Sequence, residues 1–73
     1  MTTIEDSASI GRLIREERKR QNLTQQELAG LAGVGIRFLR ELESGKDSCR
    51  LGLTLLVLQT LGLRLITVGR GVS

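Results

Sequence analysis

The sequence predicts an all-α fold of four to five helices followed by one β-strand, and three observations support it. Apolar residues recur at helical spacing between residues 10 and 43. Residues 51–61 are apolar on nearly every side, as in a buried helix. Residues 63–68 are rich in β-branched side chains and lie between two glycines, which is typical of a strand. With 73 residues, the chain has room for a single small domain, residues 1–73.

The first helix is expected from Ile10 to Gln21, with Leu13 and Ile14 on its apolar face. Asn22 tolerates a left-handed backbone and suits the end of this helix. Residues 1–8 are expected to form a flexible N-terminus. Three polar residues are possible N-caps, namely Asp6, Ser7 and Ser9.

The second helix has clear signals at both ends. Thr24 and Glu27 have the spacing of a capping box, in which each side chain bonds the free backbone N–H of the other residue. Gly33 suits the left-handed position that ends a helix. The residues expected on its inner face are Leu28, Leu31 and Ala32.

A third helix is expected after the turn at Gly33, anchored from below by Leu39 and Leu42 and followed by a loop over Ser44–Asp47. Two short helices joined by a glycine turn form a helix-turn-helix, whose second helix is the kind that enters the major groove of DNA.

The C-terminal part of the chain predicts a homodimer. A domain this small cannot bury every face of the apolar helix Leu51–Leu61, so the surplus face is expected at an interface. A single strand over 63–68 has no partner within the chain, and antiparallel pairing with a second copy is the simplest solution. A strand of another protein is the alternative partner. The expected dimer residues are Leu53, Leu56, Val57, Leu63, Leu65, Ile66 and Val68.

Composition argues against several classes of protein. The chain has no His and one Cys, Cys49, so neither a cysteine-built zinc site nor an acid–base catalytic set is apparent, and no cofactor is expected. No apolar run reaches the roughly 18 residues of a membrane span, and no signal peptide is visible, which favours a cytoplasmic protein. Eleven Lys and Arg against eight Asp and Glu give a net charge of +3, which is compatible with an anionic partner.

The segment Gln25–Leu42 resembles the Xre/Cro-type helix-turn-helix, with Ala29, Gly33 and Leu39 at its signature positions and the ending Leu42–Lys46. The remainder, residues 50–68, resembles HipB-type antitoxins of HipA/HipB toxin–antitoxin modules. The resemblance implies a strand-paired homodimer that binds palindromic operator DNA, represses its own operon and binds a HipA-like kinase toxin. The alternatives are a free-standing phage- or restriction-type repressor, or a module that neutralises a toxin and binds little DNA.

The N-terminal half of the third helix would then face the bases. Arg37 is the first candidate for base readout because a guanidinium bonds guanine at two points, with a phosphate contact or solvent as its alternatives. Glu41 lies one turn later and can hold Arg37 or accept from cytosine. Phe38 is assigned either to the groove or to the core. The candidate base contacts are Gly35, Ile36, Arg37, Phe38 and Glu41.

Backbone phosphates would be bound beside them, with Gln25 resembling the phosphate-binding glutamine of the family. The candidate phosphate contacts are Thr24, Gln25, Arg40 and Lys46. Arg18 and Glu43 match the positions of a structural ion pair in the family. The remaining basic residues of the first helix are expected to form a solvated face, a positive field or a toxin contact; they are Arg12, Arg15, Lys19 and Arg20. Gly35 departs from the family pattern because it replaces a capping Ser or Thr.

Overall fold

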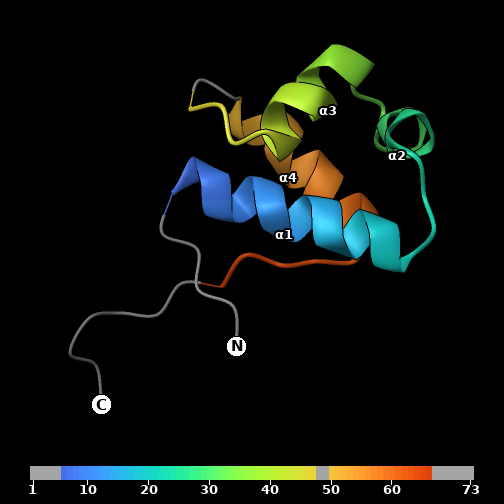
Figure 1. Cartoon of the computed structure of the whole chain (residues 1–73), viewed down its shortest axis with the longest axis horizontal. Coiled ribbons are helices and arrows are strands. Elements are labelled where there is room, and N and C mark those ends of the chain that lie inside the picture. The colour runs from blue at the N-terminus through green and yellow to red at the C-terminus, as the bar shows by residue number, and fades with distance from the viewer. Residues whose placement is uncertain (1–5, 48–49, 67–73) are drawn as a thin grey trace.

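The computed structural model describes residues 6–47 and 50–66, and within them it contains four α-helices and no β-strand. The helices are α1 (Ser7–Arg20), α2 (Gln25–Ala32), α3 (Ile36–Glu43) and α4 (Leu51–Thr60). Figure 1 shows α1 lying along one side of the molecule, with α3 above it and α4 behind both. The helix α3 packs on α1 and α2, and α2 also packs on α4. The predicted helix-turn-helix is therefore formed by α2 and α3.

The helix ends follow local capping chemistry. Asp6 is the N-cap of α1, and its carboxylate accepts from the backbone N–H of Ser9 at 2.8 Å. This cap starts the helix at Ser7, three residues before the predicted start. The predicted Thr24–Glu27 capping box is present, with N···O distances of 2.8 and 3.0 Å. The left-handed φ angles of Asn22 (60°) and Gly33 (73°) end α1 and α2 as predicted.

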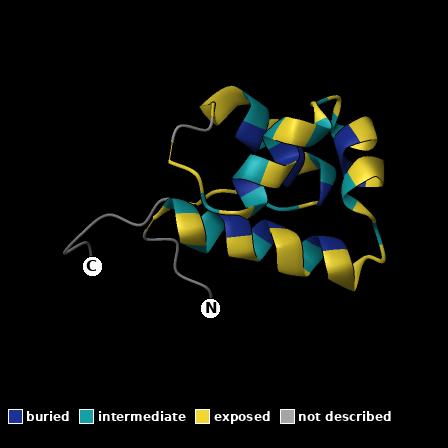
Figure 2. Cartoon of the chain, turned by 45° about the horizontal axis from the view of Figure 1, so that its top comes forward, coloured by how far each residue is buried: buried dark blue, intermediate teal, exposed yellow. Residues whose placement is uncertain are grey.

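The core consists of apolar side chains from all four helices. Figure 2 shows that the buried stretches of the helices lie toward the middle of the domain. Its members are Ile14, Leu28, Ala29, Leu39, Leu42, Val57, Leu58 and Leu61. The prediction that Leu31 lies on the inner face of α2 is wrong, because Leu31 is 66% exposed. It comes two residues after the buried Ala29, and this spacing places it about 200° around the helix.

The first and third helices cross at very short distance through Gly11. A Cβ atom added to this buried glycine would lie 2.3 Å from the carbonyl oxygen of Leu42, well inside van der Waals contact. Leu42 is a buried residue of α3. Because Gly11 has no side chain, α3 can lie this close to α1.

A polar clip joins the end of α1 to the end of α4. The side-chain amide of Gln21 donates to Glu17 Oε2 at 2.7 Å and to the carbonyl oxygen of Leu61 at 2.9 Å. The Arg20 guanidinium also bonds Glu17, and these two hydrogen-bond donors lower the pKa of the Glu17 carboxyl to about 2. The clip holds the C-terminus of α4 against α1.

In the C-terminal region, α4 buries one stripe, formed by Thr54, Val57, Leu58 and then Leu61 just beyond its end. Val57 has no exposed surface, so its predicted place in a dimer interface is wrong: a residue already buried in its own chain has no area left for a second copy. Leu56, by contrast, is 42% exposed. Residues 63–66 adopt no regular secondary structure in the single chain, and the rest of the predicted strand, including Val68, lies outside the described residues. No helix of the described residues is long and apolar enough to cross a membrane.

Candidate DNA-binding surface

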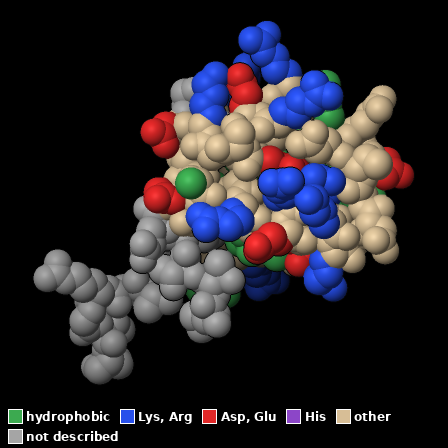
Figure 3. Space-filling model, viewed as in Figure 1, with side chains coloured by type: hydrophobic (Ala, Val, Ile, Leu, Met, Phe, Trp, Pro, Cys, Tyr) green, Lys and Arg blue, Asp and Glu red, His purple; other side chains and the backbone are tan. Residues whose placement is uncertain are grey.

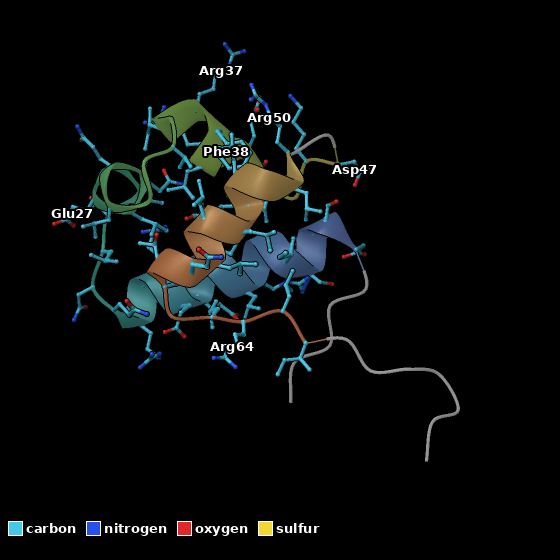
Figure 4. All side chains as sticks on the ribbon, turned by 180° about the vertical axis from the view of Figure 1, so that it is seen from behind. Glu27, Arg37, Phe38, Asp47, Arg50 and Arg64 are labelled. Atoms are coloured by element: carbon cyan, nitrogen blue, oxygen red, sulfur yellow. The ribbon has the colours of Figure 1, made fainter. Side chains whose placement is uncertain are left out.

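The exposed side of α3 carries the predicted base-reading residues. Arg37 has 92% of its side chain exposed, and Figure 4 shows it extending away from the body of the molecule. The helix begins after Gly35, whose backbone is extended and which supplies no side-chain cap. Ile36 and Phe38 are half-buried and pack against the core. Phe38 therefore has a structural role, while part of its ring stays accessible beside Arg37.

Glu41 lies between two basic side chains. Its Oε2 atom accepts a hydrogen bond from Lys46 Nζ at 2.9 Å and lies 4.0 Å from Arg37 Nε. The hydrogen bond from Lys46, aided by the charges of Lys46 and Arg37, lowers the pKa of the Glu41 carboxyl. Glu41 is therefore ionised at neutral pH and lies within ion-pair distance of Arg37, one turn further along α3.

A buried polar network ties α1 to the end of α3 and the start of α2. Arg18 Nε lies 2.7 Å from Glu43 Oε2, which is the pair that the resemblance implied. Its other nitrogens donate to Glu43 Oε1 at 3.1 Å and to the Leu23 carbonyl oxygen at 2.7 Å. Gln25 Nε2 also donates to Glu43 Oε1 at 3.1 Å. The side chains of Arg18 and Glu43 are 10% and 4% exposed, so solvent screens this pair weakly.

The hydrogen bond between the side chains of Gln25 and Glu43 was not predicted from the sequence. The two residues lie 18 positions apart, and no local pattern connects them. The bond fixes the orientation of the Gln25 amide, which keeps a second N–H for a ligand. Gln25 is thus held by the same carboxylate that holds Arg18.

A shallow hollow lies where the start of α2 meets α3. It is lined by Thr24, Gln25, Gln26, Ile36 and Arg40. The structure thereby brings together three of the four predicted phosphate contacts and one predicted base contact, whereas Lys46 follows the C-terminal end of α3. A helix N-terminus beside an arginine attracts anions through its backbone N–H groups and its dipole. Gln26 was not predicted at this site, although its position in the first turn of α2 is the signal that would have found it.

Positive charge gathers on this side of the molecule. Figure 3 shows several Lys and Arg side chains over α1 and α3, with Asp and Glu side chains between them. An exposed arginine on α3, an anion-attracting hollow and a basic surround form the arrangement that a helix needs in order to enter a DNA groove between two phosphate backbones.

Comparison with known proteins also identifies a helix-turn-helix. A family described as helix-turn-helix matches residues 14–66. A curated relative from Sinorhizobium fredii (strain NBRC 101917 / NGR234), the uncharacterized HTH-type transcriptional regulator y4mF, is 58% identical over 59 residues, covering 81% of this chain and 78% of the relative.

Among solved structures, the chain is similar to a HipB-O4 20mer complex and to a HipA-HipB-O2-O3 complex, each with a TM-score of 0.86. Each match has 22% sequence identity and covers 94% of this chain and 97% of the other. At this identity, the likeness concerns the fold.

Proposed function

Because the chain belongs to the Xre-type helix-turn-helix family, we propose that it is a transcriptional repressor that reads operator DNA with α3. The observation that carries this proposal is the position of the exposed Arg37 on α3, beside the hollow formed with the N-terminus of α2. A bidentate arginine–guanine contact discriminates between bases by about 1–3 kcal/mol.

The remaining residues of the surface divide between bases and backbone. Arg37 reads a base and Glu41 orients it, while Gly35, Ile36 and Phe38 line the approach of α3 to the groove. Phosphate oxygens are bound by Gln25 and Arg40, with Thr24 beside them in the hollow. Lys46 binds the DNA backbone from the loop that follows α3. Backbone contacts set the register of the protein on DNA without reading sequence.

We further propose a homodimer on a palindromic operator. Leu65 and Ile66 are 46% and 78% exposed, and Leu56 on α4 is also partly exposed, which leaves apolar side chains for a second copy to cover. Pairing of residues 63–68 with the same segment of that copy supplies the missing backbone partners. The two α3 helices then enter major grooves one helical turn apart, about 34–36 Å.

The likeness to HipB in a structure that also contains HipA supports an antitoxin role. In this proposal the dimer binds a HipA-like kinase toxin and represses the operon that encodes both proteins. The alternative is a free-standing repressor. The description of the curated relative as an HTH-type transcriptional regulator, with no mention of a toxin, favours this alternative. Co-expression with a kinase-like protein from a neighbouring reading frame decides between them: a stable complex supports the antitoxin, and its absence supports the repressor.

DNA binding is tested by fluorescence anisotropy on duplexes tiled across the upstream region of the gene, at two salt concentrations. We expect tight, salt-sensitive binding to one palindrome. For each half-site, Arg37→Ala should reduce the preference for that palindrome over other duplexes about 5- to 150-fold, which corresponds to one lost contact of about 1–3 kcal/mol. Gln25→Ala should weaken binding to every duplex. An equal loss on all duplexes for Arg37→Ala would refute its role in base readout.

The dimer is tested by sedimentation of Ile66→Asp, with Leu51→Asp as a control that places the same charge at another exposed apolar position, outside the proposed interface. The first variant should be monomeric and the second dimeric. Dimers of both variants would contradict the proposed interface.

A further inference from the structure

A second hollow lies beside the first, at the junction of α1, α2 and α3. It is lined by Arg15, Arg18, Gln25, Arg40, Glu43 and Ser44. Gln25 and Arg40 line both hollows, so the two adjoin along the surface. The sequence is compatible with Arg15 on a solvated face, in a positive field or at a toxin contact, and the fold places it next to the predicted phosphate contacts.

The second hollow carries unbalanced positive charge. The carboxylate of Glu43 is bonded to Arg18 and to Gln25, so it neutralises one guanidinium. Arg15 and Arg40 are exposed, and within residues 6–47 and 50–66 neither takes part in an ion pair. The basic residues Arg20, Arg37 and Lys46 each have a glutamate partner. Two guanidinium groups in one hollow with no carboxylate of their own form a site for an anion.

The base of this hollow is held in place. Arg18 and Glu43 are nearly fully buried and share two hydrogen bonds, and Arg18 is fixed further by the Leu23 carbonyl oxygen. The exposed groups above them, from Arg15 and Arg40, therefore stand on a fixed frame that joins α1 to α3. Such a frame lowers the cost of ordering the two arginines around a ligand.

We propose that this second hollow binds a DNA backbone phosphate, held by Arg15 from α1 and Arg40 from α3, next to the phosphate at the N-terminus of α2. The proposal rests on the DNA binding proposed above. Two adjoining anion sites that share Gln25 and Arg40 match two successive phosphates of one strand. Guanidinium groups suit this ligand because their planar forks bond two phosphate oxygens at once.

The test compares the salt dependence of binding for wild type, Arg15→Ala, Arg15→Lys and Lys19→Ala on one short operator duplex. Lys19 is exposed on α1 and lines neither hollow, so its variant loses the same charge without touching the site. Arg15→Ala should reduce the slope of log K against log salt concentration by about 1.8 for the proposed dimer, which is about 0.9 for one phosphate in each half-site, and Lys19→Ala should leave it nearly unchanged. Arg15→Lys should retain most of the slope. Thermal unfolding verifies that each variant is folded.

A second measurement locates the phosphate. In duplexes that carry one neutral methylphosphonate in each half-site, placed symmetrically, Arg15→Ala should weaken binding at every pair of positions except one pair, where the partner charges are already missing. Equal slopes for Arg15→Ala and Lys19→Ala, or a loss that is the same at all positions, would overturn the site while leaving DNA binding intact. Failure of wild type to bind any duplex would overturn the proposed function together with this site.

Discussion

Two regions of comparable length differ in how well their structure can be predicted from the sequence. One is the pair α2–α3, and the other is the C-terminal region, which consists of α4 and residues 61–66. In α2–α3, a capping box, a left-handed glycine and buried leucines each identify one feature of the local fold. In α4, six of the ten residues are apolar and they point to nearly every side of the helix, so the sequence does not distinguish the buried Val57 from the exposed Leu56. Polar residues are therefore as useful as apolar ones for predicting how a helix packs, because they identify the side of the helix that faces solvent.

The largest expected effect contrasts two leucines of α2. Leu28→Ala should lower the free energy of unfolding by about 2–5 kcal/mol, since Leu28 is fully buried and its truncation leaves a cavity. Leu31→Ala should change it by less than about 0.5 kcal/mol, since Leu31 is mostly exposed. Urea denaturation of both variants measures this difference. Similar losses would mean that Leu31 is covered in solution, for example by a second copy.

The next contrast concerns α4. Val57→Ala should destabilise the protein by about 2–3 kcal/mol at every protein concentration, because it removes buried methyl groups from the core of one chain. Leu56→Ala should lower the thermal midpoint only at concentrations where the proposed dimer forms. Thermal unfolding over a wide range of concentrations separates the two. A concentration-independent loss for Leu56→Ala would place Leu56 in the core of the single chain.

Two glycines make a third contrast. Gly11→Ala should cost about 1–3 kcal/mol, because the new methyl group meets backbone atoms of α3 that cannot move aside freely. Gly30→Ala should instead add about 0.5–1 kcal/mol, since Gly30 lies within α2 and nothing lies within 4 Å of its added Cβ. Chemical denaturation of the two variants measures the sign of each change in the free energy of unfolding. Stabilisation by Gly11→Ala would contradict the close crossing of α1 and α3.

The smallest effect tests the clip that holds the end of α4 against α1. The pKa of Glu17 falls from its ordinary value of 4.5 to about 2 in the folded chain, chiefly through its bond to Arg20. A lowered folded pKa gives stability that is present above pH 4.5 and is lost as the pH falls towards 2. Glu17→Gln should therefore flatten the fall of the thermal midpoint in this pH window, whereas the exposed Glu16→Gln should retain it. Parallel curves for Glu17→Gln and wild type would show that the clip is not formed.

Much of the fold was predictable because its signals are local. Asn22, the capping box and Gly33 act on their nearest neighbours, and a sequence displays such neighbours directly. Leu39 and Leu42 were predictable from their spacing along α3. The sequence offers three N-caps, since Asp6, Ser7 and Ser9 can each accept from a backbone N–H further along the chain. In the structure Asp6 is the N-cap and accepts from the N–H of Ser9.

The rest depends on contacts between distant parts of the chain. The resemblance implied the pair of Arg18 with Glu43, but the third member of the network, Gln25, joins it only once α2 lies against α3. Arg15 looked like any exposed charge of an amphipathic helix until the fold placed it beside Arg40. The structure of residues 63–66 depends on a partner in our proposal, and no pattern within one chain specifies that partner.

The two sides of α3 differ in what they contact. Leu39, Leu42 and Glu43 attach the helix to the rest of the domain, whereas Arg37 projects outward and contributes almost no buried surface. Substitutions at position 37 thus leave the attachment intact, because surface changes away from buried partners alter stability by less than about 0.5 kcal/mol. In our proposal, a lineage of such proteins can exchange the outward residue and acquire a new target sequence without rebuilding the scaffold.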